Sequence, residues 1–206
     1  MNYLLIFHIL GWVIQLEGIF FLPPAITGFL YGELNDAIVY LLLGLLCAAF
    51  GRLLRLRKNS NSTFYAKEGF VVVALSWIVI SVIGALPFVL TKDIPDALFE
   101  IISGFTTTGS SILTNVEALS HANLLWRSFS HWIGGMGVLV FILAILPMTG
   151  GSTMNLMKAE SPGPSVGKLG PKMQQTAFLL YAIYLVMTVI EIILLLVGGM
   201  PLFDSL

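Results

Sequence analysis

Charged residues and cysteines are scarce in this sequence of 206 residues. Asp, Glu, Lys and Arg make up 10% of it and hydrophobic residues 57%, whereas soluble domains carry about 25% charged residues. A water-soluble core of this size could not enclose so much apolar surface, so the composition excludes a soluble domain and indicates an integral membrane protein. The single cysteine, Cys47, excludes an internal disulfide framework and a cysteine-ligated metal cluster.

The motifs of common enzyme chemistry are missing as well. The three histidines share no metal-ligand spacing, and the sequence has no Ser-His-Asp arrangement, phosphate-binding loop or dinucleotide fingerprint. A membrane-embedded enzyme that uses Glu17, Glu191 and His131 is an alternative, but no nucleophile–base pair supports it. We therefore expect a protein that is not an enzyme and that has no covalently bound cofactor.

Long apolar stretches are what the sequence has in abundance. A helix needs about 20 apolar residues to cross a bilayer, and five stretches reach or approach that length. They comprise residues 3–22, 37–54, 69–90, 124–146 and 177–197. The pattern predicts an all-α, multi-pass membrane protein. The first stretch is too long, and too poor in N-terminal positive charge, for a cleavable signal peptide.

Positive charge is distributed unevenly among the segments that join these stretches. Eight of the ten Lys and Arg residues lie at the end of the second stretch, between it and the third, or between the fourth and fifth. This bias predicts a cytoplasmic N-terminus. The basic run Arg52–Lys58 is suited to contact with membrane lipid rather than with nucleic acid. Residues 91–123 are then external, and their acidic side chains would concentrate cations there: Asp93, Asp96, Glu100 and Glu117.

The external segment includes an apolar run that is too short to cross the membrane. In DALFEIISGF, which begins at Asp96, apolar residues recur at helical spacing, and Pro95 followed by Asp96 is typical of a helix start. About ten residues suit a re-entrant half-helix. The stretch SGFTTTGSSIL, from Ser103 to Leu113, follows and contains no charge.

Threonine and glycine at this depth fit an ion-selective loop. Non-helical backbone inside a membrane is tolerated only where it is buried in protein or lines a water-filled cavity. Backbone carbonyls of an extended stretch can replace the hydration shell of an ion, and glycine permits the angles that aim them inward. We interpret Thr107, Thr108, Gly109 and Ser110 as a candidate potassium-binding filter. An ordinary external turn is the alternative.

Three motifs, in order along the chain, resemble a known family. They are the segment that ends in the candidate filter, the helix motif WIGGMG at residues 132–137, and the motif AESPGP at residues 159–164. Together they resemble the membrane subunit of the Trk/Ktr/HKT superfamily of potassium transporters, of the bacterial Trk type. FLPPAITGFLYGE, at the first outer loop, is similar to the family's leading helix pair, so the resemblance covers nearly the whole chain.

The resemblance implies a fold of four helix–pore loop–helix repeats around one pore in the bacterial inner membrane, often after two extra helices. Residues 1–68 would be the extra pair with a basic cytoplasmic loop, and residues 69–149 the first repeat. Residues 150–206 would be a cytoplasmic loop and the first helix of an incomplete second repeat. In this superfamily glycine at the position of Gly109 goes with potassium, and serine with sodium preference.

The resemblance also implies partners. Family members are homodimers, and a cytosolic nucleotide-binding subunit gates them, so nucleotide is expected on that subunit only and potassium is the substrate. The sequence stops where a second pore helix would begin, and one filter loop cannot encircle an ion. We therefore favour a fragment of a longer transporter over the assembly of several copies. A sodium-conducting member of the superfamily and a non-conducting fragment remain alternatives.

Small and aromatic residues beside the candidate filter are expected to support it. Small residues let membrane helices approach closely, so we predict packing against the pore helix for a group in the fourth stretch. That group is Trp132, Gly134, Gly135 and Gly137, and Thr106 is a further candidate for supporting the pore.

Four polar residues fall within or at the ends of the apolar stretches. Arg127 and His131, four residues apart, share one helix face, and Arg127 could pair with an acidic residue or extend to the headgroups. Glu17 and Glu191 lie within stretches, where a charge costs about 3 kcal/mol at the bilayer centre. Each must face protein or water, or be protonated. An ion-pathway role and a buried hydrogen bond are both open for these carboxyl groups.

Overall fold

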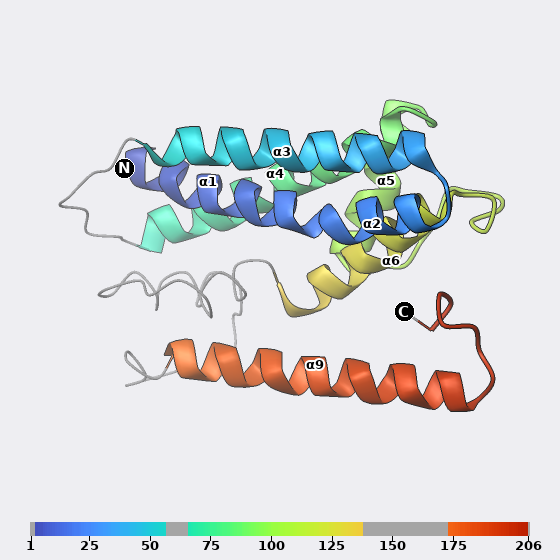
Figure 1. Cartoon of the computed structure of the whole chain (residues 1–206). Helices are drawn as coiled ribbons and strands as arrows, with labels where there is room; N and C mark the ends of the chain where they lie inside the picture. The colour runs from blue at the N-terminus through green and yellow to red at the C-terminus, as the bar shows by residue number, and fades with distance from the viewer. Residues whose placement is uncertain (1–2, 57–65, 138–172, 206) are drawn as a thin grey trace.

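The computed structural model describes residues 3–56, 66–137 and 173–205, and the regular elements in these ranges are all α-helices (Figure 1). They are α1 (Tyr3–Phe20), α2 (Leu22–Leu30), α3 (Leu34–Arg55), α4 (Ala66–Val89), α5 (Ile94–Phe105), α6 (His121–Met136) and α9 (Met173–Val197). Within the described ranges, four helical stretches are long and apolar enough to cross a membrane: Tyr3–Leu30, Leu34–Arg55, Glu68–Val89 and Ala177–Val197. The chain is therefore an all-helical, multi-pass membrane protein.

The first helical stretch is longer than the sequence predicts. α1 ends at Phe20, and α2 begins at Leu22 with Pro23 and Pro24 in its first turn. Proline is tolerated there because the first amides of a helix have no partner within it. The segment that we assigned to an outer loop is consequently helical as far as Leu30.

Glycines bring α1 and α3 into close contact along their antiparallel lengths (Figure 1). A Cβ atom placed on Gly11 would lie 2.7 Å from the carbonyl oxygen of Gly51, and one on Gly18 would lie 2.8 Å from that of Gly44. The contacts are equally close when the Cβ is placed on α3. A Cβ on Gly51 would lie 2.5 Å from the carbonyl oxygen of Gly11, and one on Gly44 would lie 2.9 Å from that of Gly18. The leading helices therefore pack backbone against backbone.

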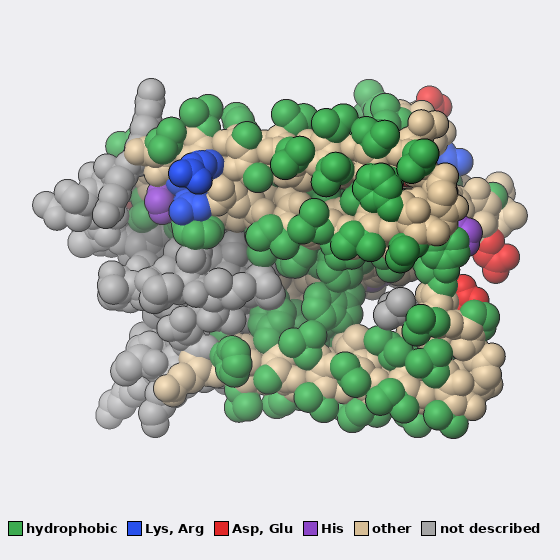
Figure 2. Space-filling view, in the orientation of Figure 1, with side chains coloured by type: hydrophobic (Ala, Val, Ile, Leu, Met, Phe, Trp, Pro, Cys, Tyr) green, Lys and Arg blue, Asp and Glu red, His purple; other side chains and the backbone are tan. Residues whose placement is uncertain are grey.

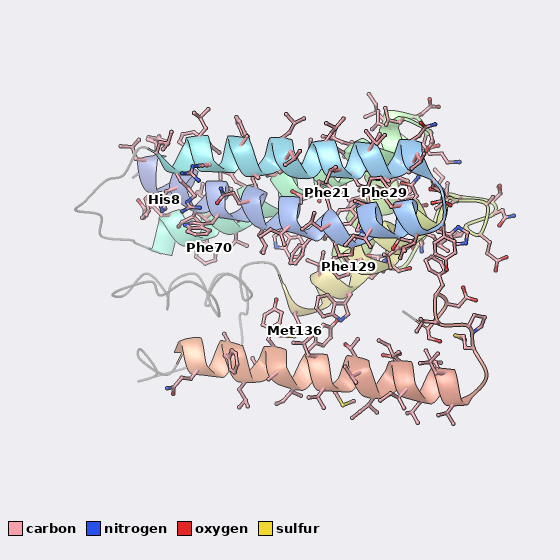
Figure 3. All side chains as sticks on the ribbon, in the orientation of Figure 1. His8, Phe21, Phe29, Phe70, Phe129 and Met136 are labelled. Atoms are coloured by element: carbon pink, nitrogen blue, oxygen red, sulfur yellow. The ribbon has the colours of Figure 1, made fainter. Side chains whose placement is uncertain are left out.

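The core lies where α1, α2 and α3 meet α4, α5 and α6. Trp126 of α6 is fully buried, and its ring centroid lies 4.6 Å from that of Phe21, at the junction of α1 and α2 (Figure 3). The indole Nε1 of Trp126 donates to the carbonyl oxygen of Gly84 in α4 at 2.8 Å. The buried hydroxyl of Tyr40 in α3 donates to Oδ1 of Asn123 in α6 at 2.7 Å. These bonds tie the leading helices to the helices that flank the candidate filter.

Helix α9 lies alongside the other helices (Figure 1) and contacts α6, and its Ala177 and Tyr181 are buried. Its Tyr184 hydroxyl donates to the carbonyl oxygen of Trp132 at 3.1 Å, and Trp132 Nε1 donates to Thr188 Oγ1 at 3.0 Å. Figure 2 shows apolar side chains along the visible face of α9, and most of its large apolar residues are exposed. Of the stretch predicted at 124–146, α6 accounts for residues up to Met136, and the remainder from residue 138 lies outside the described residues.

Candidate functional site

The helix before the candidate filter is α5, twelve residues long. It begins two residues earlier than predicted, because Asp93 adopts an extended conformation and Ile94 and Pro95 form its first turn together with Asp96. It packs against α4 on one side and α6 on the other. Ala97, Ile101 and Phe105 form its buried face. A helix of this length cannot cross a bilayer, and the candidate filter loop follows its C-terminal end.

The loop after α5 turns its amide groups back toward the helix. The amides of Thr107 and Thr108 donate to the carbonyl oxygens of Gly104 and Ser103, each at 2.9 Å. Thr107 and Gly109 have φ angles of 55° and 74°, in the left-handed region that favours glycine. The hydroxyl of Ser103 then donates to the carbonyl oxygen of Ser110 at 2.6 Å. The loop is thus held in a compact turn against the end of α5.

The carbonyl oxygens of the loop are free to serve a ligand. Among the described residues, those of Thr106 to Gly109 accept no hydrogen bond, and these four residues are exposed. The hydroxyls of Thr106 and Thr108 lie 2.8 Å apart, and Thr106 Oγ1 also donates to the carbonyl oxygen of Ile102 at 2.7 Å. A hollow of about 240 Å³ opens beside them, lined by Phe99, Ile102, Ser103, Thr106, Thr108 and Ser110. The loop thus presents uncharged carbonyl and hydroxyl oxygens at its surface.

A buried acid anchors the far end of the loop. Glu100 of α5 has no exposed side-chain surface, and its Oε2 accepts from Arg127 Nε of α6 at 2.8 Å. Its Oε1 accepts from Ser111 Oγ and from the amide of Ile112, each at 2.7 Å. Our assignment of Glu100 to an exposed acidic surface is therefore wrong, because this carboxylate is enclosed and paired. Arg127 takes the ion-pair alternative that we had left open.

The predicted group of supporting residues is divided between two neighbours. A Cβ on Gly134 would lie 2.1 Å from the carbonyl oxygen of Phe105, so Gly134 lets α6 approach the end of α5. Trp132 and Gly135 face α9 instead, since a Cβ on Gly135 would lie 2.6 Å from the hydroxyl of Tyr184. The carbonyl oxygen of Gly137 likewise accepts from a tyrosine of α9, Tyr181, at 3.0 Å.

The other polar candidates lie away from the loop's carbonyls. His131 Nδ1 is 2.8 Å from the carbonyl oxygen of Arg127 and so bonds within its own helix. Glu191 is exposed on α9, whereas Glu17 of α1 is 2% exposed. In the part of the chain that the structure describes, neither carboxyl oxygen of Glu17 has a hydrogen-bond partner. In the described part of the chain no three His, Cys, Asp or Glu residues form a group that could hold a metal ion.

A second acid, which the sequence did not single out, fixes the start of α6. The carboxylate of Glu33 accepts from the amides of His121 and Ala122 at 2.8 and 3.0 Å, and His121 Nδ1 lies 2.9 Å from it. The ring of Tyr31 stacks on His121 with centroids 3.9 Å apart. Burial acts to raise the pKa of Glu33, but these donors outweigh it, so the pKa lies below its ordinary value.

The sequence of this chain is similar to those of known transport proteins. Residues 38–200 match the family TrkH, described as cation transport protein. The chain is 40% identical over 154 residues to the Trk system potassium uptake protein TrkH of Salmonella typhimurium, which covers 72% of this chain and 32% of that protein.

Two further relatives match nearly the whole chain. The Trk system potassium uptake protein TrkG of Escherichia coli is 32% identical over 204 residues, covering 97% of this chain and 42% of that protein. An uncharacterized cation transporter of Methanocaldococcus jannaschii is 35% identical over 204 residues, covering 98% of this chain and 42% of that protein. The chain spans less than half the length of each of these relatives.

Proposed function

This chain belongs to the TrkH family of cation transport proteins, and we propose that it forms part of a channel-like pathway for potassium uptake. The family is one of transporters rather than of enzymes. In this proposal Thr107, Thr108, Gly109 and Ser110 contribute one segment of the selectivity filter. The carbonyl oxygens of Thr107, Thr108 and Gly109 replace part of the hydration shell of the ion, while that of Ser110 accepts from Ser103.

The observation that carries the proposal is the hydrogen bonding of the loop. Its amides are satisfied by the end of α5, while the carbonyls of Thr106 to Gly109 accept nothing from the described residues. A loop that exposes acceptors and hides donors favours a cation over an anion. The C-terminal end of α5 points its partial negative charge toward the same loop, which adds to the preference.

The position of α5 supports a re-entrant loop. Helix α4 leads into α5 and α6 leads away from the loop, and α5 packs against both. Arg52 and Arg55 lie in the last turn of α3, and Figure 2 shows acidic side chains at the opposite end of the molecule. This separation supports a bacterial inner-membrane orientation in which the loop opens toward the outside and the N-terminus is cytoplasmic.

Potassium is the proposed ion because relatives bear the name of potassium uptake proteins. The family resemblance, which assigns Gly109 to the position where glycine goes with potassium, favours the same ion. Sodium conduction is the second candidate, within the same family. The proposal includes a homodimer and a cytosolic nucleotide-binding subunit, with nucleotide on that subunit, as the family resemblance implies.

Ion uptake into liposomes tests the proposal. The protein, in the length in which the cell makes it, is reconstituted, and entry of radioactive rubidium is measured with competing potassium or sodium. We expect potassium to suppress rubidium entry. Sodium at the same concentration should leave most of the rubidium entry intact. Equal competition by sodium would replace potassium with the sodium alternative. Absence of any cation flux from correctly folded protein would overturn both.

A further inference from the structure

The carboxyl group of Glu17 lies directly behind the helix that leads to the candidate filter. Glu17 is buried in α1, and both of its carboxyl oxygens lack a hydrogen-bond partner among the described residues. A Cβ placed on Gly84 of α4 would lie 3.2 Å from Glu17 Oε1. The same point lies 3.0 and 3.1 Å from side-chain atoms of Phe105 and Ile101 in α5. One small space therefore borders the carboxyl group, α4 and the last turns of α5.

Among the residues that the structure describes, no positively charged side chain bonds to this carboxyl group. Cys47 of α3 packs against Gly18. Its thiol is the titratable group beside Glu17, and it would carry a negative charge if ionised, so it cannot compensate a carboxylate. On α5 and α6, Glu100 and Arg127 are paired with each other. An ionised carboxylate without partner or counter-charge is far more costly in such a place than a neutral acid.

The apolar character of the space argues against a metal cation. Cations such as potassium or sodium need several oxygen ligands at once, and Gly84, Phe105 and Ile101 present no polar side chain. A proton needs only the carboxyl group itself. We infer that Glu17 is an intramembrane proton-binding site, occupied in the packed state, and that loss of its proton disturbs the contact of α1 with α4 and α5. Transport through the adjacent loop then responds to pH.

Infrared spectroscopy tests proton binding without any transport. The protein in lipid nanodiscs is titrated with acid and base, and the carbonyl band of protonated carboxylic acids is followed. A band is expected to persist at neutral pH, at which an exposed glutamate is ionised. Glu17→Gln should lose the part of this band that Glu17 contributes, whereas Glu191→Gln, which removes a carboxyl group exposed on α9, should keep that part. A wild-type spectrum without such a band overturns the inference whether or not the variant folds. A band of undiminished intensity in Glu17→Gln also overturns it.

The pH profile of transport tests the consequence and rests on the proposed function. The wild type is expected to lose rubidium uptake on the alkaline side, while Glu17→Gln, which stays neutral, keeps its uptake there. An identical alkaline decline in both proteins would overturn the link between Glu17 and the loop. Liposomes that carry no ion while the infrared band is present would overturn the proposed function and leave the proton-binding site standing.

Discussion

Arg127 and Glu100 form an ion pair behind the candidate filter loop, with Nε and Oε2 2.8 Å apart. The side chain of Glu100 is fully buried and that of Arg127 is 15% exposed. The second oxygen of Glu100, Oε1, accepts hydrogen bonds from the Ser111 hydroxyl and the Ile112 amide. One carboxylate therefore connects α6, α5 and the end of the loop. The geometry of the loop therefore depends on a residue that contributes nothing to the ion path itself.

Replacement of Arg127 tests this connection. Arg127→Gln leaves a buried carboxylate without its counter-charge, and breaking a buried ion pair costs about 3–5 kcal/mol. We expect a lower unfolding temperature in lipid or detergent and weakened uptake. The double variant Glu100→Gln with Arg127→Gln removes the charge as well and should recover part of the lost stability. An Arg127→Gln protein as stable as the wild type would show that the pair does not hold the loop.

The approach of α6 to α5 predicts different effects at two adjacent glycines. In Gly134→Ala the new methyl group meets the backbone oxygen of Phe105, which cannot move without shifting α5. In Gly135→Ala it meets the tip of the Tyr184 side chain. Overpacking costs about 1–3 kcal/mol, and we expect the larger loss at Gly134. Thermal unfolding of the two variants side by side measures the difference, and the reverse order would contradict the packing.

The contact of Glu33 with His121 predicts a dependence of stability on pH. Because the pKa of Glu33 in the folded protein lies below its ordinary value, its contribution is fully present above the ordinary pKa and is lost as the pH falls through the folded one. Glu33→Gln should therefore be less stable than the wild type at neutral pH, and the two should converge at strongly acid pH. Unfolding temperatures across a pH series measure this.

The control for that series is Glu117→Gln, which removes an exposed acid from the same side of the protein. Its unfolding temperature should follow that of the wild type at each pH. A constant gap between Glu33→Gln and the wild type, down to the lowest pH, would mean that the carboxylate charge contributes nothing to the start of α6.

The sequence predicted the helices well because their length and hydropathy are set by the bilayer. It gave α3, α4 and α9 to within a few residues, and it separated the short α5 from the spans. It missed α2 because a pair of prolines suggests a loop, although Pro23 and Pro24 occupy the two positions where a helix accepts them.

The contacts between distant residues were harder to foresee. Glu33 and His121 are 88 positions apart, and no local pattern marks an acid that caps another helix. The glycines of WIGGMG look equivalent in the sequence, yet Gly134 faces α5 and Gly135 faces α9. Which face of a helix meets which neighbour depends on the rotation of that helix in the assembled fold. The role of Thr107 to Ser110 in binding an ion remains a prediction.

Ion selectivity of Gly109→Ser tests the central claim most directly, and Gly32→Ser is its matched control. Both glycines have nearly the same left-handed φ, 74° and 77°, and a Cβ on either meets nothing within 4 Å. Backbone strain of about 1 kcal/mol is thus common to both variants. Rubidium uptake against competing sodium should lose its preference for potassium in Gly109→Ser and keep it in Gly32→Ser. Unchanged selectivity in Gly109→Ser would contradict the assignment of this loop as a filter.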